Sequence, residues 1–227
     1  MKKMLLVSVV GAMSVFSAIA ADSVFTSPYV GLRAKYDSIS MEHKMDIGIE
    51  TYSSVARSVY GGGIMFGAKL FDVMRAEFEY SFGMGKRTNN ISNAGMIFIK
   101  EELTTHSLFG NVYYDFDIEQ LGGIKPYIGA GFGVGIKGLT TEVDLKKLGL
   151  PGYTAVDDTF TSFLWNVGAG VSYAINNNFT LDIGYRYMDY GKETFDSHPS
   201  SAPGETFKNE LDMSSVHEIY IGARYNF

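Results

Sequence analysis

Apolar and polar residues alternate one by one along eight segments of this 227-residue chain. Between residues 128 and 136, for example, apolar side chains occupy every second position and glycines the positions between them. A period of two is the pattern of a β-strand that has one apolar and one polar face. The eight segments are 30–36, 64–70, 74–82, 108–116, 128–137, 163–173, 179–187 and 218–227. The sequence therefore predicts an all-β protein.

The connections between these segments alternate in length. Three are short and lie at residues 70–72, 117–123 and 176–178, whereas the other four cover residues 37–58, 83–103, 138–160 and 190–213. The long ones have about twenty residues each, far above the usual two to five of a hairpin loop. An even number of strands with short turns at one end and long loops at the other is typical of outer-membrane barrels. We therefore expect an eight-stranded antiparallel transmembrane β-barrel, connected as an up-and-down meander.

The charged residues of the segments share one face, with seven bases and five acids on it. Charges at the bilayer midplane cost several kcal/mol each, so this face is expected to line the barrel interior. The predicted lumen charge network consists of Arg33, Lys35, Lys69, Arg75, Glu77, Glu79, Asp115, Asp182, Arg186, Glu218 and Arg224, and Lys137 lies on the same face. A secreted lipocalin-like barrel would instead turn its apolar face inward, but the aromatic strand ends suit membrane interfaces better.

The glycines at 129, 131, 133 and 135 fall on the same inward face. They are expected to leave room for long side chains from neighbouring strands. Their spacing, inside a strand pattern, is not that of a nucleotide-binding loop, which has G-x-G-x-x-G before a helix.

The N-terminus has the pattern of a secretory signal peptide. Lys2 and Lys3 precede an apolar stretch at 4–16, and the small residues Ala18 and Ala20 then occupy the −3 and −1 positions of a cleavage site before Ala21. We expect a signal peptide at 1–20 and a barrel domain at 21–227. An uncleaved anchor is the alternative, but the apolar stretch is short for a membrane span.

Composition excludes several function classes. The chain has no cysteine, so it has no disulfide framework and no thiolate nucleophile. Its formal net charge is −6, and removal of the two lysines with the signal peptide gives −6 − 2 = −8. An acidic balance argues against a nucleic-acid partner.

The C-terminal residues Gly222, Tyr225 and Phe227 form a pattern that resembles the signal by which the assembly machinery of the outer membrane recognises its barrels. Together with the segments 28–31 and 125–131, this pattern resembles small outer-membrane barrels of the opacity-protein and OmpA-transmembrane kind, which include surface antigens. The resemblance implies secretion through the inner membrane and integration into the cell outer membrane. Outer-membrane lipid and the assembly machinery are then partners.

Functions within such families range over adhesins, passive structural barrels, narrow channels and a few lipid-modifying enzymes. The four long loops hold 15 acidic and nine basic residues, and loops on a rigid scaffold commonly carry function. The more specific hypothesis is that the loops contact a host or extracellular ligand. The simpler hypothesis is that they only cover the barrel mouth. A small porin-like channel is the alternative, although eight strands enclose little more than side chains.

An enzyme finds no support in the sequence, and neither a cofactor nor a catalytic residue is predicted. His106 and Ser107 are adjacent in a strand, so they point to opposite faces. Barrel lipid A deacylases, by contrast, place His and Ser two residues apart. His43 and His198 are expected to be solvated in loops, and the loop acids Asp157 and Asp158 lack the spacing of a calcium loop, so no metal site is predicted.

Overall fold

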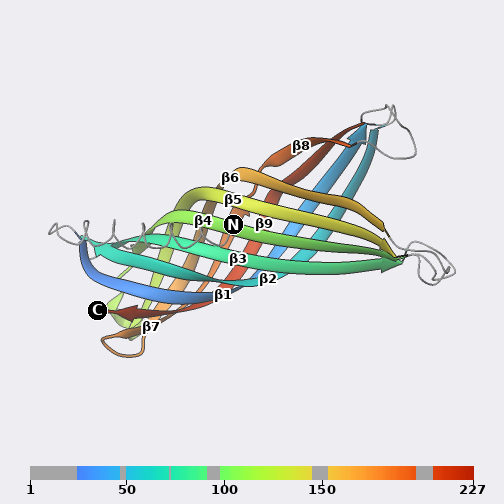
Figure 1. The fold of residues 1–227 in the computed structure, drawn as a ribbon. Coiled ribbons are helices and arrows are strands. Elements are labelled where there is room, and N and C mark those ends of the chain that lie inside the picture. Colours follow the sequence, from blue (N-terminus) through green and yellow to red (C-terminus); the bar gives the residue numbers. More distant parts are fainter. Residues whose placement is uncertain (1–24, 47–49, 72, 91–97, 145–152, 198–206) are drawn as a thin grey trace, which may run out of the picture.

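In the computed structural model of the chain, the described residues contain nine strands, which form one antiparallel sheet (Figure 1). The structure describes residues 25–46, 50–71, 73–90, 98–144, 153–197 and 207–227. The strands are β1 (Phe25–Asp46), β2 (Glu50–Leu70), β3 (Met74–Asn90), β4 (Phe98–Asp115), β5 (Ile124–Asp144), β6 (Tyr153–Ala174), β7 (Phe179–Asp189), β8 (Lys192–Ser197) and β9 (Phe207–Asn226). A 3-10 turn, η1 (Glu119–Leu121), lies between β4 and β5. Among the described residues, no helix is long and apolar enough to cross a membrane.

The sheet closes on itself because β9 pairs with β1, from Tyr29 opposite Asn226 to Asp46 opposite Lys208. Each other wall strand pairs with its neighbour in chain order, and β7 pairs with β9. Strand β8 follows β7 after Gly191, which has a positive φ of 74°, and pairs with β9 beyond the end of β7. Eight strands therefore form the wall, and the predicted eight-stranded meander is confirmed.

Alternation along the strands separates a lipid-facing surface from a filled interior. Leu32 is 65% exposed, whereas the next residue, Arg33, is 5% exposed. The same contrast holds for Ile219, at 58%, beside the fully buried Glu218. Bands of exposed aromatic and aliphatic side chains suit hydrocarbon, and a closed barrel leaves no unpaired edge within it.

The four long connections are not loops over most of their length, which corrects the sequence-based boundaries. Strands β1 and β2 continue through nearly all of 37–58, and β3 and β4 similarly extend into 83–103. Asp157 and Asp158, expected in a loop, lie within β6, and His43 lies within β1. The predicted loops also hold two apolar stretches, at 96–99 and 148–151. Residues 98–99 lie within β4, and the remaining residues of both stretches, together with His198, fall outside the described residues.

Above the barrel the wall divides into two four-stranded sheets, which we call blades. Pairing between β2 and β3 stops at Tyr60 opposite Met84, and pairing between β6 and β7 stops at Trp165 opposite Asp189, although β2, β3 and β6 continue beyond these points. The first blade consists of β8, β9, β1 and β2, and the second of β3 to β6. Figure 1 shows the two groups diverging at the end of the barrel opposite the C-terminus.

Candidate functional site

The middle of the lumen holds a buried ion network centred on Glu79. Both terminal nitrogens of Arg186 donate to the Glu79 carboxylate at 2.9 Å, and Arg33 Nη1 donates to the same group. Arg33 Nη2 also donates to Glu77 Oε1 at 3.2 Å, and Arg186 Nη2 to Glu218 Oε2 at 3.2 Å. Strands β1, β3, β7 and β9 are thereby connected through the barrel interior.

A second group lies next to this network on the side of the blades. Lys35 Nζ is 2.9 Å from Asp37 Oδ2 and 3.3 Å from Glu218 Oε2. Lys137 Nζ donates to the carbonyl oxygen of Tyr190 at 2.8 Å. Asp37 is fully buried but was missing from the sequence-based set, because position 37 was assigned to a loop.

Two further pairs lie toward the end that carries the short turns. Arg224 Nε and Nη2 donate to Asp182 at 2.6 and 2.8 Å, and Nη2 also donates to Ser172. Arg75 Nε donates to both oxygens of Asp115, at 3.0 and 2.8 Å. Lys35 is joined to the central network through Glu218, whereas the Arg224–Asp182 and Arg75–Asp115 pairs lie apart from it.

Tyrosines occupy the space between these pairs and the central network. Tyr113, Tyr127 and Tyr220 form a buried cluster, and the hydroxyls of Tyr127 and Tyr220 are 2.8 Å apart. Gly129, Gly170 and Gly184 make room for them. A Cβ at Gly129 would lie 2.2 Å from Tyr113 Cδ1, so this position accepts no larger residue without a shift of the ring.

An apolar layer closes the lumen beneath the blades. Its buried members are Ile39, Val59, Leu103, Phe109, Leu164, Met188, Tyr190, Met213 and Val216. On β1, β7 and β9 these residues follow the charged ones in the direction of the blades. Sequence reasoning missed this layer because most of its members fall in or beside the segments taken for loops. The inward alternation that continues through Lys35, Asp37 and Ile39 could have revealed it.

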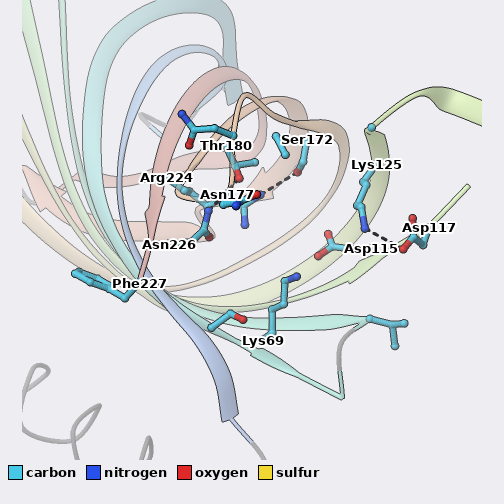
Figure 2. Close-up of a pocket in the computed structure, with 15 residues that line it drawn as sticks. Lys69, Asp115, Asp117, Lys125, Ser172, Asn177, Thr180, Arg224, Asn226 and Phe227 are labelled. Atoms are coloured by element: carbon cyan, nitrogen blue, oxygen red, sulfur yellow. Dashed lines mark hydrogen bonds and ion pairs between the residues drawn. The ribbon is translucent and has the colours of Figure 1, made fainter. Parts of the chain in front are cut away.

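The opposite mouth contains an open cavity of about 500 Å³ (Figure 2). Lys69, Asp115 and Arg224 are among its lining side chains, as are Lys125 and Asp117, whose Nζ and Oδ2 atoms are 2.9 Å apart. Both acids and bases therefore line the mouth, and the cavity ends at the buried pairs above it.

We expect the wild-type barrel to carry no steady ionic current in planar-bilayer recordings. Side chains fill the interior of an eight-stranded barrel, and a dry apolar constriction opposes the passage of ions. The apolar layer and the ion network lie in series along the lumen, and both consist of buried side chains. A stable conductance of the folded wild-type protein would contradict this expectation and favour the channel alternative.

His106 and Ser107 face opposite sides of the wall. Ser107 is buried and its Oγ is 2.9 Å from Ser81 Oγ, whereas His106 is exposed on the lipid side. The two-residue spacing of Ser and His occurs instead at Ser215 and His217, whose Oγ and Nε2 atoms are 3.5 Å apart. The other ring nitrogen of His217 contacts the Tyr185 hydroxyl at 2.6 Å.

In a hydrolase triad an acid stabilises the imidazolium, and the Tyr185 hydroxyl beside Nδ1 of His217 does not replace such an acid. The Ser215–His217 arrangement therefore does not match a catalytic triad. Within the described ranges, no group of three or more His, Cys, Asp or Glu residues could hold a metal ion.

Two residues of the predicted assembly signal lie on the outer face at the short-turn end. Tyr225 and Phe227 are exposed there, with ring centroids 5.2 Å apart, while Gly222 faces inward. The Phe227 amide donates to the carbonyl oxygen of Pro28 at 3.0 Å, which fixes the last residue against β1. The predicted cleavage residues Ala18, Ala20 and Ala21 lie outside the described part of the chain.

A closed wall with an apolar outer band and a charged, filled interior defines an integral outer-membrane β-barrel. The chain belongs to the family of the outer membrane protein beta-barrel domain, which matches residues 8–227. This result confirms the expected family and the expected location in the outer membrane.

Individual relatives agree with this assignment. The outer membrane protein PagN of Salmonella typhimurium is 22% identical over 194 residues, which cover 79% of this chain and 78% of PagN. Neisserial surface protein A is similar in fold, with a TM-score of 0.52, 22% identity, and coverage of 89% of this chain and 99% of that structure. The outer membrane protein OprG of Pseudomonas aeruginosa has a TM-score of 0.54, 17% identity, and coverage of 89% and 97%. These relatives carry the names of outer-membrane and surface proteins, not of enzymes.

Proposed function

We propose that this protein is a surface protein whose two blades contact a host or extracellular ligand, while the filled barrel serves as their membrane anchor. The observation that carries this proposal is the combination of a lumen filled with side chains and strands that continue well beyond the closed wall. A barrel that only needed to connect its strands would end in short turns, as it does at the opposite end.

The structure of the blades suits a contact role. Hydrogen-bonded strands hold the hairpins in a fixed shape, so a ligand meets a surface that needs little ordering on binding. The ion pair between Arg57 of β2 and Glu101 of β4, at 2.8 Å, joins the two blades. The similarity to Neisserial surface protein A is consistent with exposure at the cell surface.

The charge of the external segments indicates the kind of ligand. The four connections carry 15 acidic and nine basic residues, a net charge of 9 − 15 = −6. Electrostatic complementarity then favours a ligand with a basic or mixed surface over a strongly acidic polymer.

Shortening the hairpins should abolish binding to host cells without unfolding the barrel. Turns of two residues would replace 43–53, 90–98, 142–153 and 195–209, all beyond the apolar layer. Bacteria that display the wild type should bind cultured cells, and those that display the shortened barrel should bind at the background level. Heat-modifiable gel migration checks that the shortened protein folds, and single-hairpin variants identify the blade responsible. Unchanged binding by a folded, fully shortened barrel would contradict the proposal.

A further inference from the structure

Two hydrogen-bonded Tyr–His pairs lie on the lipid-facing surface. The hydroxyl of Tyr80 is 2.8 Å from His106 Nδ1, with stacked rings whose centroids are 6.2 Å apart. The hydroxyl of Tyr185 is 2.6 Å from His217 Nδ1, with centroids 6.0 Å apart. In each pair the histidine lies opposite the residue two positions after the tyrosine, which is Phe82 in β3 and Tyr187 in β7.

The surroundings of the two pairs are repeated as well. Residues 106–116 and 217–227 align without a gap and share His, Tyr and Phe at the first, ninth and eleventh positions. The amide of the terminal Phe of each segment donates to a proline carbonyl: Phe116 to Pro126 and Phe227 to Pro28. Because β3–β4 and β7–β9 are separated by half of the eight wall strands, the pairs lie on opposite sides of the barrel.

The strand geometry places both histidines at the outer interface. Ten residues separate His106 from Phe116 and His217 from Phe227. Ten residues span roughly 33 Å along a strand, and the usual tilt reduces this to about 25 Å across the membrane, the height of the apolar band. With each phenylalanine at the periplasmic edge of the band, each histidine lies at its outer edge, among the lipid headgroups.

At the outer interface each histidine presents a hydrogen-bond donor. When the tyrosine hydroxyl donates to Nδ1, the neutral imidazole carries its proton on Nε2. In the described part of the chain, Nε2 of His106 has no protein partner, and that of His217 has the weak 3.5 Å contact with Ser215. A donor that faces lipid without a partner is costly, so an acceptor from the lipid is expected there.

A lysine lies farther along the strands, on the blade side of each pair. Lys86 is 2.9 Å from Glu102 and Lys192 is 2.8 Å from Asp212, and both lysine side chains are more than half exposed. Burial raises the pKa of the Asp212 carboxyl, but hydrogen bonds from Lys192 and Ser214 lower it by more, so it lies below its usual value. An ammonium group has three donors and can bind an anion while it is paired with an acid.

We propose that the Tyr80–His106 and Tyr185–His217 pairs are two equivalent binding sites for the phosphorylated headgroup of an outer-leaflet lipid. Each imidazole donates to a phosphate oxygen at the interface, and Lys86 or Lys192 supplies positive charge above it. Tyr80 and Tyr185 are positioning residues that hold the ring and its tautomer. The two sites flank the barrel and fix its depth and rotation in the outer leaflet, a role separate from ligand contact by the blades.

Native mass spectrometry of the detergent-solubilised barrel, with diphosphoryl lipid A as the probe, tests the stoichiometry. The wild type should retain two lipids, His106→Leu or His217→Leu one, and the double variant none. Tyr60→Phe, which changes an exposed tyrosine of β2 that belongs to neither pair, should still retain two. Leucine suits a lipid-facing position, and heat-modifiable migration checks that every variant is folded.

The lipid chemistry is tested in the same experiment. Lipid A without phosphate should not be retained, and excess inorganic phosphate should leave the bound lipid in place. Tyr80→Phe and Tyr185→Phe should each weaken one site, so that a higher lipid concentration is needed for the second lipid. Two lipids on the double histidine variant, equal retention of the dephosphorylated lipid, or displacement by inorganic phosphate would each overturn the proposal.

Discussion

Glu79→Ala should lower the free energy of unfolding by about 3–5 kcal/mol, because it leaves buried cations without their partner. The carboxylate accepts hydrogen bonds from both Arg186 and Arg33, and all three side chains are shielded from solvent. Urea titration of the barrel folded in detergent measures the loss. The single tryptophan, Trp165, lies on the lipid-facing surface and reports unfolding by its fluorescence.

Asp117→Ala is the matched control, since it breaks an ion pair at the water-exposed mouth. The side chains of Lys125 and Asp117 are 43% and 70% exposed, and such a pair contributes only about 0–1 kcal/mol. Equal losses in the two variants would show that the central network adds no more than a surface pair. Glu79→Gln keeps the volume but removes the charge, so a loss close to that of alanine assigns the effect to electrostatics rather than to a cavity.

This dependence on buried charge follows from the arrangement of the barrel, in which the apolar face is outside and the charged face is inside. The apolar face of each strand is committed to lipid, so the interior must be built from the other face. Arginine and tyrosine have the length to reach across the lumen from facing strands, and Gly129, Gly170 and Gly184 leave space for the tyrosine rings. Stability then depends on whether each buried donor finds an acceptor, more than on the packing of aliphatic side chains.

Sequence could predict the wall because lipid enforces alternation there. Within the membrane, Leu32 and Arg33 face hydrocarbon and lumen, so their types differ sharply. Beyond the membrane both faces of a strand meet water or protein, and the alternation weakens. The sequence 37–46 therefore reads as a loop, although it continues β1. The apolar layer was missed for the same reason.

Which charged residues pair within the lumen depends on the register of neighbouring strands. The alternation of apolar and polar residues shows which face a residue is on but not the register. Glu77 lies two residues from Arg75 on the same strand, and both belong to the predicted lumen charge network. Arg75 instead donates to Asp115, because Tyr113 lies opposite Arg75 and brings the next inward residue of β4 within reach. Glu77 accepts hydrogen bonds from Arg33 and from the hydroxyl of Tyr29, at 3.2 and 3.0 Å.

Deleting Phe227 should strongly reduce insertion into the outer membrane of cells while it changes folding of the purified barrel in detergent far less. Two effects meet at this residue. Its ring is 73% exposed on the lipid side, so its loss removes lipid-facing contact worth about 2 kcal/mol. By resemblance, it is also the last residue of the pattern Gly222, Tyr225 and Phe227, which the assembly machinery reads.

The two effects can be measured separately because folding in detergent does not need the assembly machinery. Phe227→Leu keeps an apolar side chain and the amide bond to Pro28 but removes the aromatic ring, so it should fold in detergent like the wild type and still insert poorly in cells. Phe116→Leu is the matched control, since Phe116 makes the equivalent amide contact with Pro126 inside the chain, where no terminal signal is read. It should insert normally. Normal insertion of the Phe227 deletion would refute the assembly role. Equal defects in cells and in detergent would assign the residue a purely structural one.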